Sequence, residues 1–335
     1  MPWLALVLFL VVLLLLRQPA IAVLFELAED CSFDWGTYRA TLRITRAIEL
    51  LRPDALMRRS LRQLRVHALE ALGDTPRAVE AARHLADEAR SADDWGLANT
   101  AINTFINAGL YREALEVERG WPHPETSPSH PLGPDEQRDL ARLNLCEALY
   151  NLGEWDAASE RLRALEEAHA DEPLLRHALL LQRGWILAHD GHAEEGLAAM
   201  DRLRRDELPR VYWSEVAFTR AAVLLVLQRH DEAEKAAREG LSLARRAASL
   251  RNGLFMLGLI SLARGRLEEA SRHFEAGAAH PYKGQGGSAL LAWGECLEKL
   301  GQGARARGAW RLVLERDPQS AAAREAASRL EQAAH

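Results

Sequence analysis

Apolar residues recur along this chain at the three- and four-residue spacing of amphipathic helices, and small residues punctuate them at fixed places. One pattern occurs in three copies: a Gly, a second Gly seven residues after it, a Gly or Ala five residues after the second Gly, and a large apolar residue four residues after that. The second Gly suits a chain reversal and the next small residue a close helix crossing, so each copy predicts a helix, a turn and a second helix. The copies are Gly184, Gly191, Gly196 and Met200; Gly258, Gly265, Ala270 and Phe274; and Gly294, Gly301, Ala306 and Trp310.

The small residue that follows each turn can be traced through seven periods. Successive small residues are 36, 44, 38, 37, 37 and 36 residues apart, and Gly stands five residues before all but one, where Gln228 replaces it. No segment alternates at period two, so we expect an all-α chain of about seven stacked helical hairpins. The small residues are Ala78, Ala114, Ala158, Gly196, Ala233, Ala270 and Ala306.

These hairpins resemble the tetratricopeptide repeat (TPR) family over about residues 59–318. The best-matching residues are Leu257, Gly258, Gly265, Ala270, Phe274 and Pro281, then Trp293, Gly294, Gly301, Ala306, Trp310 and Pro318. The periods exceed the family's usual length of about 34 residues, and the residues where the family has Gly in the first helix include Val66, Ile102, Cys146 and Ala221. The resemblance implies a right-handed α-solenoid whose concave groove binds peptides or partner helices, without intrinsic catalysis.

The first 16 residues contain no charged side chain. As a helix they span ~24 Å, and the apolar residues after Arg17 can extend this toward the ~30 Å of a hydrocarbon core. We therefore expect a transmembrane signal anchor over residues 1–25 that contacts the lipid bilayer. The alternative is a secretory peptide cleaved after Ala22, because residues 20–22 form an A-x-A site. Against cleavage, no Lys or Arg precedes the apolar run.

Arg residues follow the apolar run, so the positive-inside rule favours a single-pass protein of the inner membrane with its repeats in the cytoplasm rather than the periplasm. In outline the chain resembles the bacterial lipopolysaccharide-assembly repeat proteins, which carry one membrane helix and a cytoplasmic TPR array. Those proteins end in a metal domain with paired CxxC motifs, which this chain lacks.

The remaining sequence divides into three parts. Residues 26–52 read as a linker and an incomplete first repeat, residues 53–318 as the solenoid, and residues 319–335 as a C-terminal capping helix. The longest period contains a Pro-rich insertion at residues 121–134, which is incompatible with helix. It is either a partner-binding arm or a tolerated surface loop.

In the family that the repeats resemble, the first helix of each hairpin lines the groove. Asn99, Asn103 and Asn107 fall at i, i+4 and i+8 on one such helix. Their carboxamides can donate to and accept from the main chain of an extended peptide, although a solvated helix face is the alternative. The polar groove floor is expected to continue through Gln63, His67, Glu147 and Tyr150.

Further along, the same face becomes apolar. We expect it to form the C-terminal wall of the groove, where a partner covers it. The alternative is that these side chains belong to the core between helices. The residues concerned are Trp185, Phe218, Leu225, Phe255, Leu259 and Leu262.

Candidates for chemistry are few. The net charge is -6 and no basic run is interleaved with aromatic residues, so we expect no nucleic-acid partner. His189, Asp190 and His192 straddle a turn without a third ligand, and the three cysteines (Cys31, Cys146 and Cys296) lack CxxC spacing. We expect no enzyme, cofactor, metal or small-molecule substrate.

Two functions remain open. The sequence favours a membrane-tethered adaptor or scaffold that binds proteins or peptides through its groove. The alternative is an exported periplasmic envelope-assembly or chaperone-like factor.

Overall fold

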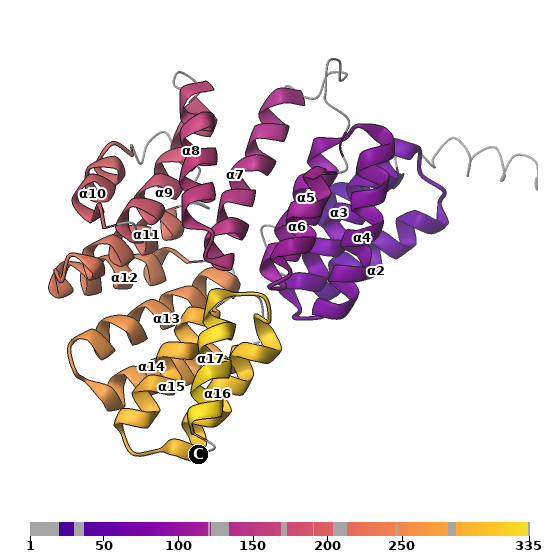
Figure 1. Ribbon diagram of the computed structural model, residues 1–335. Coiled ribbons are helices and arrows are strands. Elements are labelled where there is room, and N and C mark those ends of the chain that lie inside the picture. Colours follow the sequence, from indigo (N-terminus) through magenta and orange to yellow (C-terminus); the bar gives the residue numbers. More distant parts are fainter. Residues whose placement is uncertain are drawn as a thin grey trace, which may run out of the picture. The chain divides into compact units, whose positions relative to one another are not determined.

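The computed structural model describes residues 20–29, 37–119, 121, 134–168, 173–189, 191–203, 213–244, 247–280 and 286–333. Every regular element in these ranges is a helix, which confirms the expected all-α class (Figure 1). The chain divides into an N-terminal unit, Met1–Leu85, and a C-terminal unit, Ala86–His335.

The N-terminal unit has a small core of its own. A helical stretch over residues 20–29 precedes α2 (Tyr38–Leu50), α3 (Ala55–Ala71) and the first part of α4 (Thr75–Ala92). Ile21 packs with Ile48 and Leu61, and the Thr41 hydroxyl donates to the Ala28 carbonyl at 3.5 Å. The stretch 20–29 therefore runs antiparallel to α2.

The expected anchor at residues 1–25 lies outside the described residues, except for residues 20–25. Among the helices that the structure describes, none combines the length and apolar character needed to cross a bilayer. Of the Pro-rich insertion, the described residues are Trp121 and the start of α7. The Trp121 indole donates to the Asp93 carboxylate at 2.7 Å and packs on Trp95, with ring centroids 4.3 Å apart.

After the last part of α4, the described residues of the C-terminal unit form six hairpins and one closing helix. The hairpins are α5 (Trp95–Asn107) and α6 (Tyr111–Arg119), α7 (Pro134–Leu152) and α8 (Trp155–Ala168), α9 (Pro173–His189) and α10 (Ala193–Asp201), α11 (Trp213–Val226) and α12 (His230–Leu243), α13 (Ala247–Ala263) and α14 (Leu267–Ala279), and α15 (Gly287–Lys299) and α16 (Gly303–Arg316). The closing helix is α17 (Ala321–Gln332), and Ser320 caps it by accepting a hydrogen bond from the Ala323 N–H at 3.0 Å.

The seven predicted turns are confirmed by their backbone angles. Each predicted reversal residue has φ between 58° and 83°, and the exception in the sequence, Gln228, takes the same left-handed conformation with φ 58°. Glycine adopts this conformation at little cost, which explains why it fills the other six positions. The small residue after each turn is buried. The hairpin repeat is thus set by local chain geometry.

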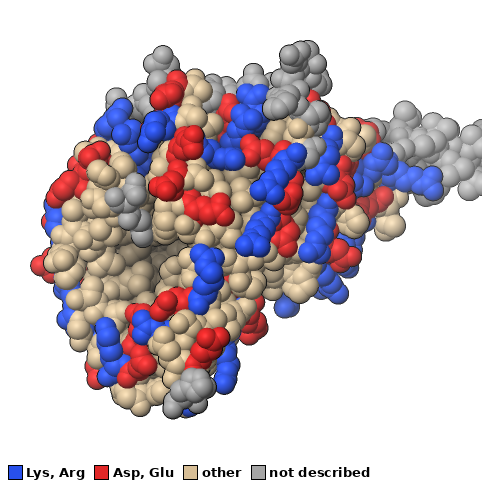
Figure 2. All heavy atoms as spheres, in the orientation of Figure 1, with Lys and Arg blue, Asp and Glu red and all other residues tan. Residues whose placement is uncertain are grey.

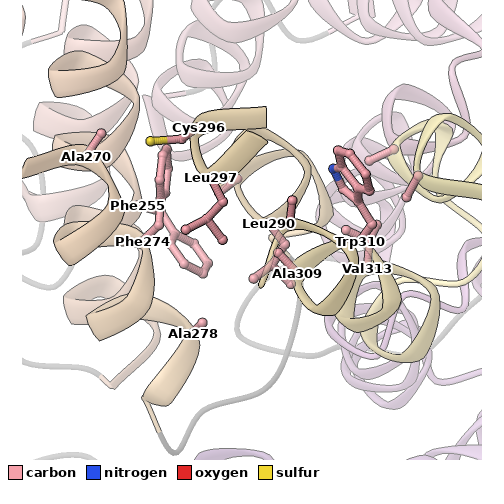
Figure 3. Packing of buried hydrophobic residues seen from close by; sticks show 14 of the residues in the cluster. Phe255, Ala270, Phe274, Ala278, Leu290, Cys296, Leu297, Ala309, Trp310 and Val313 are labelled. Atoms are coloured by element: carbon pink, nitrogen blue, oxygen red, sulfur yellow. The ribbon is translucent and has the colours of Figure 1, made fainter. Parts of the chain in front are cut away.

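Gly at the start of each clear copy makes room for the large residue at its end. A Cβ on Gly258 would lie 2.6 Å from the Phe274 ring, and one on Gly184 would lie 2.7 Å from the Met200 sulfur. A Cβ on Gly294 would overlap the Trp310 indole. Phe274 and Trp310 are both fully buried in the core of the last hairpins (Figure 3).

The first helices of the C-terminal unit form a row that closes on itself. Each of α5, α7, α9, α11 and α13 contacts the next first helix, α15 contacts α17, and α17 in turn contacts α7 (Figure 1). The Gln319 side chain accepts a hydrogen bond from the Arg112 N–H at 2.8 Å and donates to Glu113 at 2.7 Å. The Arg324 guanidinium donates to the Leu152 carbonyl at 2.7 Å. The sequence does not predict this closure.

Candidate partner-binding surfaces

The three predicted asparagines form one polar stripe with residues of the next hairpin. Asn99, Asn103 and Asn107 are half-buried on the least buried face of α5. The Asn99 carboxamide oxygen accepts a hydrogen bond from Asn144 of α7 at 2.7 Å, and a longer one from Asn103 at 3.5 Å. We call this set, with Asn144, the asparagine surface. Sequence reasoning missed Asn144, because nothing in the α7 sequence shows that it faces Asn99.

Glu147 and Tyr150 follow Asn144 on α7, but only the first remains half-buried. The Tyr150 ring packs edge-on against Trp155 at 4.1 Å and lies 5.8 Å from Trp185, which is half-buried on α9. Burial, as the largest influence, raises the pKa of the Tyr150 hydroxyl above its ordinary range, so it stays protonated. Tyr150 therefore joins α7 to α8 and α9, while Trp155, 37% exposed, offers an aromatic face to solvent.

The two phenylalanines expected on the apolar wall are core residues. Phe218 and Phe255 are each only 5% exposed. A Cβ on Gly240 of α12 would lie 2.5 Å from the Phe218 ring, and one on Gly286 would lie 2.7 Å from the Phe255 ring. These rings fill space that neighbouring glycines leave open, so they point between helices, as the alternative interpretation has it.

The other residues of the expected apolar wall are half-buried and pack against two hydrophobic core clusters of the C-terminal unit, one of which contains Phe255. These residues are Trp185, Leu225, Leu259 and Leu262. Figure 2 shows a hollow in the C-terminal unit whose visible surroundings are largely uncharged. The part of this surface that a partner can reach is therefore smaller than the sequence pattern suggests.

Gln63 and His67 lie on α3 in the N-terminal unit, both half-buried. The His67 ring meets Tyr38 of α2 edge-on, with centroids 6.0 Å apart. The described contact of His67 is therefore with α2 of the same unit.

A second candidate surface, not expected from the sequence, is formed by α2, α3 and the start of α4. It is a cleft of about 560 Å³ lined by four arginines, three leucines and one aspartate. Two of these arginines lie seven residues apart on α2, a spacing that places them on one helix face. That spacing is the signal that sequence reasoning could have used. The lining residues are Arg39, Leu42, Arg46, Arg65, Leu69, Leu72, Asp74 and Arg77. We call it the arginine cleft.

A buried polar cluster lies where the row of first helices closes. The Asp317 carboxylate accepts a hydrogen bond from the Gly287 N–H at 3.1 Å, and the buried Tyr111 hydroxyl faces the same carboxyl group. Burial, as the largest influence, raises the pKa of Asp317 above its ordinary value. The cluster holds the start of α15 and the α5–α6 turn together and has the character of a structural contact.

The described residues offer little for chemistry. No group of His, Cys, Asp or Glu among them could hold a metal ion. Of the candidate metal ligands considered from the sequence, Asp190 lies outside the described residues. Cys146 and Cys296 are free and buried, and burial raises the pKa of the Cys146 thiol to about 12. Both thiols therefore serve as small apolar side chains.

Comparison with known proteins places one segment in a family. Residues 288–320, which cover α15, α16 and the turn before α17, match the family model described as tetratricopeptide repeat. No curated protein sequence matches the chain.

Several solved structures share low similarity with the chain. PilW, a type IV pilus biogenesis factor, is 16% identical, with 72% of this chain and 98% of PilW covered and a TM-score of 0.43. MamA from Desulfovibrio magneticus is 16% identical, with 54% and 95% covered and a TM-score of 0.34. A TPR protein from Parabacteroides merdae is 17% identical, with 70% and 79% covered and a TM-score of 0.37. All three TM-scores lie below 0.5.

The family match falls on the predicted copy with the clearest geometry. Within residues 288–320, Gly294 meets Trp310 at the helix crossing and Gly301 makes the left-handed turn with φ 72°. Residues 288–320, which form α15, α16 and the turn before α17, are therefore similar to a tetratricopeptide repeat.

Proposed function

We propose that this protein is a membrane-tethered adaptor that binds other proteins or peptides through the first helices of its hairpins, without catalysing a reaction. The observation that carries the proposal is the asparagine surface. It places half-buried carboxamides from two neighbouring first helices within hydrogen-bond distance of one another. Each carboxamide has two N–H donors and an oxygen acceptor, and the main chain of an extended peptide needs both.

The composition of this surface favours recognition over stability. Asn is a poor helix former, so three at i, i+4 and i+8 on α5 weaken that helix relative to Ala or Leu. Their half-buried state leaves part of each carboxamide open to solvent or to a partner. Trp155, which packs on Tyr150 of α7, adds an exposed aromatic ring, the side-chain type enriched at interaction sites.

A photoreactive amino acid tests the partner-binding part. We place it at Asn103 in the full-length protein and, as a matched control, at the exposed Glu160 on the second helix α8. We expect a protein adduct from Asn103 that is absent from Glu160 and that weakens when Asn144→Ala removes the bond to Asn99. Adducts of equal yield at both positions, or at neither, would contradict the proposal.

The tether rests on the uncharged residues 1–16 in the sequence. Retention of an anchor predicts a full-length intact mass and a protein that stays in the membrane fraction after alkaline washing. It raises the local concentration of the protein near membrane-bound partners, so that even a weak surface can act.

The alternative function is an exported periplasmic envelope-assembly or chaperone-like factor. It is favoured by the A-x-A site that ends at Ala22. A native protein lacking residues 1–22 in intact mass analysis, recovered from the periplasm, would establish this alternative and exclude the tether.

A further inference from the structure

From the arginine cleft and its position in the N-terminal unit, we infer a second binding site: the cleft and the exposed face of α2 bind the phosphate groups of anionic phospholipids at the bilayer surface. This inference rests on the tether of the proposed function and adds a lipid class to it. The occupant is the headgroup layer of the membrane that the proposed tether enters.

The cleft carries uncompensated positive charge. Arg77 pairs with Asp74 at 3.3 Å and Arg65 lies 3.9 Å from Glu49, so each has an acidic neighbour. Arg39 and Arg46 have no ion-pair partner among the residues that the structure describes. Two guanidinium groups therefore remain for an outside anion, and guanidinium forms bidentate hydrogen bonds with phosphate.

Charge across the chain points the same way. Residues 37–85 contain 10 Arg and 5 Asp or Glu, a net charge of +5, whereas the whole chain carries -6. The positive charge thus lies on α2, α3 and the first part of α4, and Glu26, Glu29, Asp30 and Asp34 separate it from the apolar N-terminal segment. A basic segment beside a membrane span is attracted to the negative surface of anionic lipids.

Exposed leucines lie at the end of the unit where the described stretch 20–29 begins. The antiparallel contacts of Ile21 with Ile48 place residue 20 toward the C-terminal end of α2. Leu50, in the last turn of α2, is 85% exposed, and Leu56, in the first turn of α3, is 73% exposed. Leucines this exposed suit insertion into the headgroup and acyl boundary.

One face of α2 combines these features. Arg39, Arg43, Arg46 and Leu50 fall at i, i+4, i+7 and i+11, opposite the buried Ile48, and all four are exposed. Leu42, Leu69 and Leu72 line the cleft together with the arginines. Basic side chains in the same lining as leucines match a lipid better than a free inorganic anion.

The test uses the full-length protein in nanodiscs. Hydrogen exchange over α2 is compared between a purely zwitterionic bilayer and one containing an anionic phospholipid. We expect anionic lipid to slow exchange at residues 39–50 by roughly fivefold or more, the factor that one Arg contributes at an anionic surface. Arg46→Glu should abolish the difference. Arg83→Glu, the same charge change on an exposed α4 position outside the cleft, should preserve it.

Circular dichroism of each variant checks its fold. Leu50→Ser gives an independent probe of membrane contact, because the Leu50 side chain packs little within the protein. Equal exchange in both bilayers, or equal loss with Arg83→Glu, overturns the site. Protection in zwitterionic nanodiscs by inorganic phosphate alone, or by poly-glutamate alone, assigns the cleft to a small anion or an acidic protein and overturns the lipid. Failure of the full-length chain to enter nanodiscs sinks the tether and this inference together. Entry without an anionic-lipid effect sinks only this inference.

Discussion

Substituting Gly294 tests the packing rule on which the repeat depends. Ala is a better helix former than Gly by about 1 kcal/mol, so Gly→Ala stabilises a helix where space is open. At Gly294 space is not open, because the new Cβ would overlap the indole of Trp310, which is 1% exposed. Overpacking a core costs roughly 1–3 kcal/mol. Since the overlap involves a rigid ring, we expect the upper part of that range and a net destabilisation of about 1–2 kcal/mol.

Gly308 on α16 supplies the matched control. A Cβ there meets no atom within 4 Å, so Gly308→Ala should stabilise by about 0.5–1 kcal/mol. Denaturant unfolding gives the free energies, and hydrogen exchange over α15 and α16 locates the change, because repeat arrays need not unfold in a single step.

A double-mutant cycle isolates the overlap. In a Trp310→Leu background the ring is gone, and Gly294→Ala should recover the stabilising sign seen at Gly308. If Gly294→Ala alone stabilises as much as Gly308→Ala, the small residue at the crossing is not required and the packing rule fails.

Three further predictions follow from the closing contacts and the buried groups. Gly109→Ala should destabilise more than Gly301→Ala and should speed hydrogen exchange in α17; both have φ 72°, but only at Gly109 does the Cβ come within 2.9 Å of the Asp317 Cα. Asp317→Asn should alter the pH dependence of stability. The pKa of Asp317 in the folded protein is raised above the ordinary 3.8, so the wild-type carboxyl stabilises the fold most below that pH and less as pH rises through the raised pKa. Denaturant unfolding from pH 4 to 7 should show this decline only with Asp317. Cys146, with a pKa of about 12, should resist alkylation at pH 8 in the folded protein and react on unfolding, as peptide mass mapping can follow.

The turn positions are predictable from sequence because one local property decides them. A left-handed reversal favours Gly, and the fixed spacing to the next small residue confirms the frame even at Gln228. The pairing of Gly258 with Phe274 is predictable for the same reason, since both lie within one hairpin.

The direction of the apolar side chains is less predictable. The sequence does not decide whether Phe255 lies on the groove wall or in the core. Helical spacing shows which residues share a helix face, but not which other part of the protein covers that face. Gly277 and Gly286, the residues that receive the Phe255 ring, lie more than 20 residues away. The arginine cleft depends on how α2 packs against α3. The lengths of these helices do not determine their packing, so the sequence does not predict the cleft.

The closure of the C-terminal unit bears directly on the candidate surface. Helix α7 carries Asn144, and the carbonyl of its last residue, Leu152, accepts the hydrogen bond from Arg324 of α17. The Gln319 side chain binds the start of α6, whose partner helix α5 carries the other three asparagines. The two helices that form the asparagine surface are therefore held from the far end of the chain as well as by their sequence neighbours. A surface held at both ends loses less conformational freedom when it binds, which favours affinity from a small number of polar contacts.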